Sequence, residues 1–300
     1  MKKFLKLLFS VLIAGLCLTL IIIYVMDKAV FEKSETLPFQ KIDKYYSSDR
    51  KFNMGILGSS RAQGNYVPSI LNSRGSVQNF GLAGTGNKIW YYMLLDELQN
   101  SSSMKLIVSI DLSAKPIKNG KDFDYNYYLK LPRKTKLYEA LEPATKGQML
   151  PKPIFYFGVM KGFSAESLKD YINLTNINDN GFKGKTNTIS QEQFQTLVGK
   201  QSSIKVKFDS DLWKKTFEKI KTSQDTVYFV LAPSYNKIIE RINYTEFKDG
   251  MEELASNYPT VYFYDFSNSI NEKNLFYDPE HLNYKGAVKF STMLKDSIFN

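Results

Sequence analysis

The chain has 300 residues, enough for a membrane segment and one sizeable globular domain. Its 40 Lys and Arg against 30 Asp and Glu give a formal net charge of +10, and its 20 tyrosines and 21 phenylalanines argue against a disordered chain. The lysines are spread out rather than gathered in one stripe, so the charge does not indicate nucleic-acid binding. It favours attraction to anionic surfaces such as lipid headgroups or phosphate-bearing wall polymers.

A long apolar segment follows a basic N-terminus. Residues 1–6 hold three lysines, and residues 7–26 are apolar apart from four scattered positions. About 20 such residues span a bilayer as a helix, whereas a cleaved secretory signal has a shorter core and a small-residue cleavage site. Because this segment ends in Ile21-Ile22-Ile23-Tyr24, we favour an uncleaved single-pass anchor. The lysines before it predict a cytoplasmic N-terminus and an extracytoplasmic domain at the cell membrane.

Cysteine usage limits the chemistry. Cys17 is the single cysteine of the chain and lies inside the apolar segment, after Leu16 rather than after the small residue of a lipoprotein signal. The rest of the chain therefore has no disulfide and no thiol chemistry. With one histidine in the chain there is no Cys/His cluster for zinc. We expect neither a metal nor a cofactor.

The elements predicted in chain order alternate between strands and helices. Residues 27–50 are mixed and charged, which is typical of a stalk and a lead-in helix. Short apolar runs predict strands, and apolar residues at helical spacing predict helices, with Asp209 or Ser210 as the cap of the second helix. Such alternation predicts an α/β fold with a parallel sheet covered on both faces, whose ligands bind beyond the carboxyl ends of the strands. The predicted strands are 52–57, 76–80, 105–112, 226–231 and 260–266, and the predicted helices are 88–98, 211–220, 246–254 and 286–298.

One stretch breaks this alternation. About 95 residues rich in Lys, Tyr, Asn and Pro separate the third strand from the helix at 211, and a structureless loop of that length is improbable in a compact domain. We expect an inserted subdomain at about 115–209, over the strand ends. The run 122–136 either binds a glycan chain or forms a solvated surface. The expected domains are the anchor 1–26, the stalk 27–50 and a globular domain 51–300.

Two serines follow the first strand. The run MGILGSSRAQG, residues 54–64, leads from apolar residues into Gly58-Ser59-Ser60-Arg61. These residues are ordinary turn formers. Alternatively, Ser60 is a nucleophile at the carboxyl edge of the sheet.

The single histidine, His281, stands three residues after Asp278 in the run FYDPEHLNYKGA. In a turn these two positions share a face, so the carboxylate can accept the imidazole Nδ1–H and leave Nε2 to take a proton from a serine. Serine needs such a base near neutral pH. A structural histidine after an ordinary Asp-Pro turn is the alternative.

Taken together, these motifs resemble the SGNH (GDSL-type) hydrolase superfamily: Gly58-Ser59-Ser60 after the first strand, NFGLAG after the second, and DPEHLN before the last helix. The resemblance implies a flavodoxin-like three-layer fold, with Ser60 as nucleophile and Asp278 and His281 as its relay. It also implies an oxyanion hole made by the N–H groups of Ser60 and Gly84. The GSS triplet, the anchor and the insertion are most similar to membrane-anchored proteins of the D-alanyl-lipoteichoic-acid transfer (DltD) type and to SGNH partners of polysaccharide O-acetylation.

The third block departs from the superfamily pattern. Most members have an oxyanion-binding Asn after the third strand, and this chain has Ser109-Ile110-Asp111-Leu112-Ser113 instead. An ionised Asp111 pointing inward would repel an oxyanion, while Ser113 or a backbone amide is a candidate substitute. Arg61 either binds a substrate phosphate or carboxylate, or pairs with a local acid.

The expected function is a membrane-anchored serine esterase or acyltransferase that passes an acetyl or D-alanyl group to an anionic envelope glycopolymer through an acyl-Ser60 intermediate. The resemblance implies a membrane-bound O-acyltransferase as partner. The alternative is a catalytically weak SGNH-fold scaffold of an envelope acylation complex, which the missing Asn favours. A lipase or thioesterase of cytoplasmic type is a third reading, which the charge and the orientation of the span disfavour.

Overall fold

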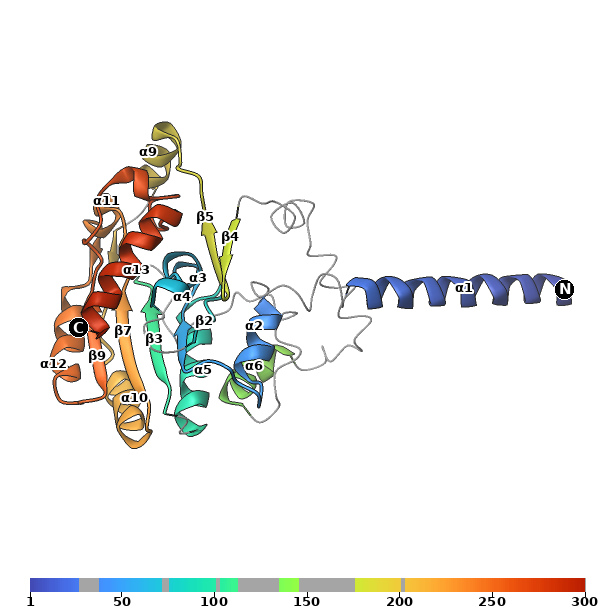
Figure 1. Cartoon of the computed structure of the whole chain (residues 1–300), viewed down its shortest axis with the longest axis horizontal. Coiled ribbons are helices and arrows are strands. Elements are labelled where there is room, and N and C mark those ends of the chain that lie inside the picture. Colours follow the sequence, from blue (N-terminus) through green and yellow to red (C-terminus); the bar gives the residue numbers. More distant parts are fainter. Residues whose placement is uncertain are drawn as a thin grey trace.

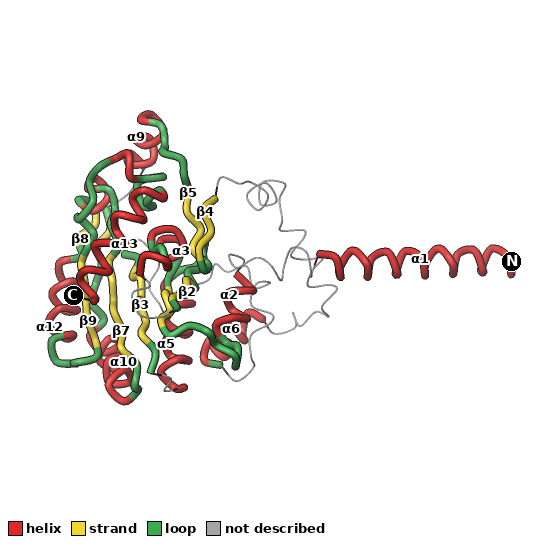
Figure 2. The backbone as a smooth tube through the Cα atoms, in the orientation of Figure 1, coloured by secondary structure: helices red, strands yellow, loops and turns green. Residues whose placement is uncertain are grey.

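A five-stranded parallel sheet forms the centre of the computed structural model, which describes residues 1–26, 38–71, 76–100, 103–112, 135–145, 176–200 and 203–299 (Figures 1 and 2). The strand order is β2-β1-β3-β7-β9. Counted along the chain this is 2-1-3-4-5, the flavodoxin-like order of doubly wound sheets. The predicted α/β class and all five predicted strands are confirmed. The strands are β1 (Met54–Leu57), β2 (Val77–Asn79), β3 (Lys105–Ile110), β7 (Thr226–Leu231) and β9 (Val261–Asp265).

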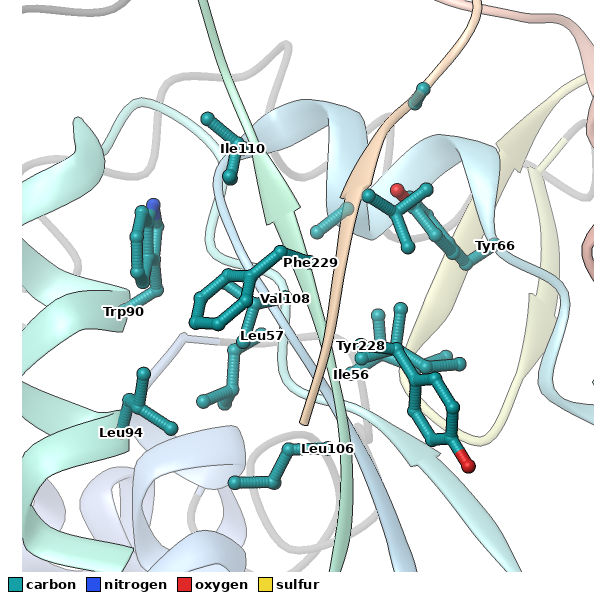
Figure 3. Close-up of a cluster of buried hydrophobic side chains, with 14 of the residues drawn as sticks. Ile56, Leu57, Tyr66, Trp90, Leu94, Leu106, Val108, Ile110, Tyr228 and Phe229 are labelled. Carbon is teal, nitrogen blue, oxygen red and sulfur yellow. The ribbon is translucent and has the colours of Figure 1, made fainter. Parts of the chain in front are cut away.

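Side chains that alternate along the central strands face two different helical layers. In Figure 3, Leu57 and Phe229 point toward Trp90 of helix α5 (Asn87–Asn100), while Ile56 and Tyr228 lie on the side of Tyr66. All six are buried, as expected where a parallel sheet is covered on both faces. The rings of Trp213 and Phe229 pack edge-on with their centroids 5.3 Å apart, and those of Tyr66 and Phe290 with their centroids 5.0 Å apart. The protein is therefore a three-layer structure.

The four helices predicted from the sequence are confirmed, and two shorter helices that were not predicted join them. One layer contains α5 (Asn87–Asn100), α10 (Ser210–Thr222) and α12 (Thr245–Ala255), and the other contains α3 (Ser60–Asn65), α4 (Pro68–Leu71) and α13 (Tyr284–Phe299). Asp209 caps α10 by accepting from the Leu212 N–H at 3.1 Å, which satisfies one of the unpaired donors of the first turn. The shorter elements are α11 (Asn236–Ile239), β6 (Ile204–Lys205), β8 (Ile242–Asn243) and the 3-10 helix η4 (Lys273–Leu275).

The N-terminal apolar segment is one helix, α1 (Lys2–Met26). Its part Lys2–Ile22 has a mean hydropathy of 2.5. It is long and apolar enough to cross a membrane or to act as a signal anchor.

A second helix, within the segment expected to form a stalk and a lead-in helix, packs on the core. Helix α2 (Pro38–Tyr45) buries Lys41, Ile42 and Tyr45. The Tyr45 hydroxyl donates to the Met93 carbonyl of α5 at 2.9 Å, and its ring meets Phe80 edge-on at 5.0 Å. Next along the chain, Arg50 forms an ion pair of 2.5 Å with Glu97, whose side chain is fully buried.

The described parts of the expected insertion contact the core at several places, and a hairpin and a helix provide two of these contacts. The hairpin of β4 (Asn176–Asp179) and β5 (Phe182–Lys185) packs on α3. Its turn residues Asn180 and Gly181 both have positive φ, as a tight hairpin turn requires, and the Asn180 carbonyl accepts from the Asn79 N–H at 2.8 Å. Helix α6 (Lys136–Thr145) packs on α5. Ser113 and most of the run 122–136 lie outside the described residues.

The burial of α2 predicts where a folded fragment can begin. A chain starting at residue 51 lacks Ile42, Tyr45 and Arg50, and removing buried side chains of this size costs about 2–5 kcal/mol each. We expect its free energy of unfolding to fall by at least about 5 kcal/mol relative to a chain starting at residue 36. Urea denaturation followed by circular dichroism measures the difference. Equal midpoints for the two fragments would show that α2 is dispensable.

Candidate active site

The end of β1 brings Ser60 to the carboxyl edge of the sheet. Gly58 has φ of +150°, and a Cβ there would lie 2.6 Å from Ala62 Cβ and 3.0 Å from Ser109 Cβ. A glycine is therefore required for this sharp passage from strand to helix. Ser59 occupies the N-cap position and Ser60 begins α3, so the Ser60 N–H has no carbonyl partner within the helix.

Three side chains predicted from the sequence lie together at this edge. Ser60 Oγ is 2.8 Å from His281 Nε2, although the two residues are 221 positions apart in the chain. His281 Nδ1 is 2.9 Å from each carboxylate oxygen of Asp278. The His281 and Asp278 side chains are each 26% exposed, so the cluster lies at the surface of the fold, where a substrate can approach it.

A tight turn holds Asp278 against His281. The Asp278 carboxylate also accepts from the backbone N–H groups of Glu280 at 2.8 Å and His281 at 2.9 Å. Phe276 and Leu282 close the turn with an isolated β-bridge. Burial opposes ionisation of Asp278, but the hydrogen bond and charge of His281 and the two N–H donors outweigh it and lower the pKa of Asp278. The carboxylate is thus ionised at neutral pH.

This geometry is suited to proton transfer from Ser60. In the neutral tautomer whose Nδ1–H donates to the Asp278 carboxylate, the Nε2 lone pair of His281 is directed at the Ser60 hydroxyl. The imidazole can then remove the hydroxyl proton as an acyl carbon approaches.

Arg61 pairs within the fold rather than facing the site. It is 4% exposed, and its Nη2 donates to the carbonyls of Ala232 at 2.5 Å and Pro233 at 3.1 Å and to Ser234 Oγ at 2.7 Å. Its Nη1 lies 3.9 Å from Asp111. Of the two readings of Arg61, pairing with a local acid is the one observed, while a substrate-binding role stays a prediction that the burial of the guanidinium disfavours.

Asp111 is held in the same network. Its carboxylate accepts from Ser59 Oγ at 3.1 Å, and its carbonyl accepts from the Asn87 side chain at 3.0 Å. The charge of Asp111 therefore faces Ser59 and Arg61. This compensation reduces the repulsion that an inward-pointing carboxylate would exert on an oxyanion.

Two asparagines that the sequence reasoning did not single out hold the cluster together. The Asn65 Oδ1 atom, at the end of α3, accepts from the Leu282 N–H at 3.1 Å, next to His281. Asn79, at the end of β2, donates to the carbonyls of Ala62 and Tyr66 at 2.8 and 3.0 Å and accepts from the Gly81 N–H at 2.9 Å. Asn79 is part of the NFGLAG motif, which is the one signal that could have identified it.

Gly84 lies in the exposed loop between β2 and α5 with φ of +75°. That left-handed conformation explains the glycine. No contact among the described residues assigns its N–H to an oxyanion hole, so this role stays a prediction, as it does for Ser113.

Two cavities are lined in part by residues described above, one by Asp111 and the other by Asp278. One, of about 690 Å³, is bounded by Asp111 and has a mostly apolar lining that includes Trp90, Leu112, Val206 and Trp213. The other, of about 810 Å³, is bounded by Tyr277 and Asp278 and has a more polar lining. Its polar residues are Asn187, Thr188, Glu192, Gln193 and Thr196. Within the described ranges, no group of three or more His, Cys, Asp or Glu side chains is arranged to hold a metal ion.

Comparison with known proteins does not assign the chain to a family of known function. A family model that carries no description of function matches residues 165–300, less than half of the chain. No curated protein sequence matches. Among solved structures, a protein from Streptococcus pneumonia described provisionally as a platelet activating factor has 13% identity and a TM-score of 0.39, covering 93% of this chain and 99% of its own.

The contacts of Arg61 predict the effect of shortening its donor array. Arg61→Lys keeps the charge but loses the planar fork, so buried carbonyls of the loop after β7 lose their donors. We expect the free energy of unfolding to fall by about 1–3 kcal/mol, measured by urea denaturation. A substrate-binding arginine would instead raise KM and leave the denaturation midpoint unchanged.

The lowered pKa of Asp278 predicts a pH-dependent stability difference. Because the folded state favours the ionised carboxylate, its contribution is fully present above the ordinary Asp pKa of about 4. It is lost as the pH falls through the lower pKa of the folded state. We expect wild type to be more stable than Asp278→Asn at pH 7, with the difference shrinking below about pH 4. Thermal melts across pH 2–7 test this, and a constant difference would contradict it.

Proposed function

We propose that this protein is a membrane-anchored serine esterase or acyltransferase that transfers a small acyl group, acetyl or D-alanyl, to hydroxyl groups of an anionic envelope glycopolymer. The observation that carries the proposal is the hydrogen-bonded row Ser60 Oγ, His281 Nε2, His281 Nδ1 and Asp278, with distances of 2.8 and 2.9 Å. A serine that is bonded to an imidazole oriented in this way is the arrangement used for acyl transfer on several unrelated folds.

The proposed reaction has two steps, acylation of Ser60 and transfer of the acyl group to the acceptor. Ser60 Oγ attacks the carbonyl carbon of the donor ester while His281 Nε2 takes the hydroxyl proton, and the bond to the donor alkoxide then breaks as His281 returns that proton to it. The product is an acyl ester on Ser60. In the second step a polymer hydroxyl attacks the acyl carbon, His281 takes its proton, and Ser60 leaves with a proton regained. If water enters instead, the same steps hydrolyse the ester.

The oxyanion formed in each step needs donors. The Ser60 N–H at the start of α3 and the Gly84 N–H are the proposed pair, and donors of this kind contribute about 3–4 kcal/mol each. The resemblance to SGNH proteins supports this assignment because Gly58-Ser59-Ser60, NFGLAG and DPEHLN occur in the family's order. It also supports a membrane-bound O-acyltransferase as partner and a location outside the cell membrane.

The two cavities suit the two substrates of a transfer reaction. The polar cavity beside Asp278 matches a hydroxyl-rich acceptor, and the apolar cavity beside Asp111 matches the carbon skeleton of a donor.

A scaffold without turnover is the second candidate. It is favoured by Asp111, which stands where most SGNH enzymes carry an oxyanion-binding Asn.

Neighbouring serines provide a matched test. A fluorophosphonate probe should label the wild-type protein, and Ser60→Ala should abolish labelling and lower the hydrolysis of p-nitrophenyl acetate by about 10⁴-fold or more. Ser59→Ala removes the adjacent hydroxyl, which bonds to Asp111, and should retain labelling. In-gel fluorescence and a rate assay measure both.

The scaffold candidate predicts a different result. Wild-type protein that is folded, takes no label and releases no p-nitrophenol would exclude turnover at Ser60. Labelling that survives in Ser60→Ala would move the nucleophile to another residue.

A further inference from the structure

A buried lysine of α2 contacts the loop that carries Gly84. Lys41 is 1% exposed, and its Nζ donates to the Gly81 carbonyl at 2.6 Å. Lysines are almost never fully buried unless they are paired, yet among the described residues no carboxylate pairs with this one. Burial, with a smaller effect from Lys183, lowers the pKa of Lys41 well below its usual range.

Gly81 is held by contacts to its N–H, its carbonyl and its Cα. Its N–H donates to Asn79 Oδ1 at 2.9 Å, and its carbonyl accepts from Lys41. Its Cα rests on the backbone of α3, since a Cβ at Gly81 would lie 2.3 Å from the Gln63 nitrogen and 2.7 Å from the Ala62 carbonyl carbon. The next residue, Leu82, donates to the Gly58 carbonyl at 3.0 Å.

These contacts join the loop to the segment of the nucleophile. Gly58 precedes Ser60 by two residues, and Gly81 precedes Gly84 by three. The position of Gly81 therefore limits the direction in which the following turn can point the Gly84 N–H. Lys41 is the contact in this set that comes from outside the segment 54–79.

A donor is what distinguishes lysine from an apolar residue here. A methionine has a similar length and would fill the same space without the desolvation of an ammonium group. It would leave the Gly81 carbonyl without its side-chain donor.

We propose that Lys41 is a positioning residue, which holds the loop 81–84 against α3 so that the Gly84 N–H faces an oxyanion on the acyl carbon attached to Ser60. The inference rests on the proposed function for its catalytic consequence. It makes α2, the first described helix after α1, part of the architecture of the site.

Tyr45 provides a control on the same helix. Lys41→Met and Tyr45→Phe each remove one buried hydrogen bond from α2 to a backbone carbonyl, of Gly81 and of Met93 respectively. Only the first carbonyl belongs to the loop. Both variants would be made in the full chain in detergent and compared with wild type in Tm and in kcat and KM for p-nitrophenyl acetate.

We expect Lys41→Met to lower kcat by about 10- to 100-fold, as a misplaced oxyanion donor does, with KM within about threefold. Tyr45→Phe should keep kcat within about twofold of wild type, even if its Tm falls as much as the Tm of Lys41→Met. Lys41→Arg, which retains a long donor, should recover part of kcat. A kcat for Lys41→Met equal to that of Tyr45→Phe would overturn the proposal and reduce Lys41 to a structural role.

Hydrogen exchange separates this proposal from the proposed function. In Lys41→Met the amides of residues 82–86 should exchange faster than in wild type, whereas in Tyr45→Phe they should not. That comparison can be made even if the wild-type protein has no turnover. Absence of turnover would refute the proposed enzymatic function, and the exchange rates would then decide alone whether Lys41 holds the loop. Unchanged exchange in Lys41→Met would overturn the proposal. If Lys41→Met does not fold, Lys41→Gln, too short to reach Gly81, takes its place with the same expected result.

Discussion

The hydrogen bond between the Asn65 side chain and the Leu282 backbone joins two segments on which the candidate site depends. One is α3, which begins with Ser60, and the other is the turn that carries Asp278 and His281. A second link runs through the loop after β7. Arg61 of α3 donates to the Ala232 carbonyl at the start of this loop. The Tyr235 N–H, three residues later, donates to the Pro279 carbonyl of the turn at 3.0 Å. Both links are buried and polar, so loss of either would leave unsatisfied groups and shift the two segments relative to each other.

The framework that carries these segments was predictable from the sequence. Strands such as 226–231 are almost wholly apolar, which is the pattern of a parallel strand buried on both faces, and 211–220 has apolar residues on one side of a helix. Ser60, His281 and Asp278 could also be identified, because a strand end and a three-residue spacing are local features of the chain. Their contact across 221 residues follows from the parallel topology, which gathers the strand ends at one edge.

The residues that support the site were not predictable in the same way. Asn65 and Lys41 have no local signature, since their roles depend on partners that only the tertiary structure brings near. The reading of residues 27–50 as a stalk and lead-in helix could not reveal that α2 is buried, because its eight residues hold too few apolar positions to distinguish a packed helix from an exposed one. Arg61 illustrates the same difficulty: the sequence left two roles open, and the carbonyls that occupy its guanidinium come from residues 232–233.

The 221-residue separation between Ser60 and His281 has a consequence for biosynthesis. A chain made from its N-terminus presents β1 and α3 long before the turn at 276–282 exists. Contacts this distant in sequence form late and slowly, since loop closure precedes any reward from them. Until the turn at 276–282 has been made, Ser60 has no imidazole beside it. The proposed activity would therefore be absent from the nascent polypeptide until this turn has folded onto α3.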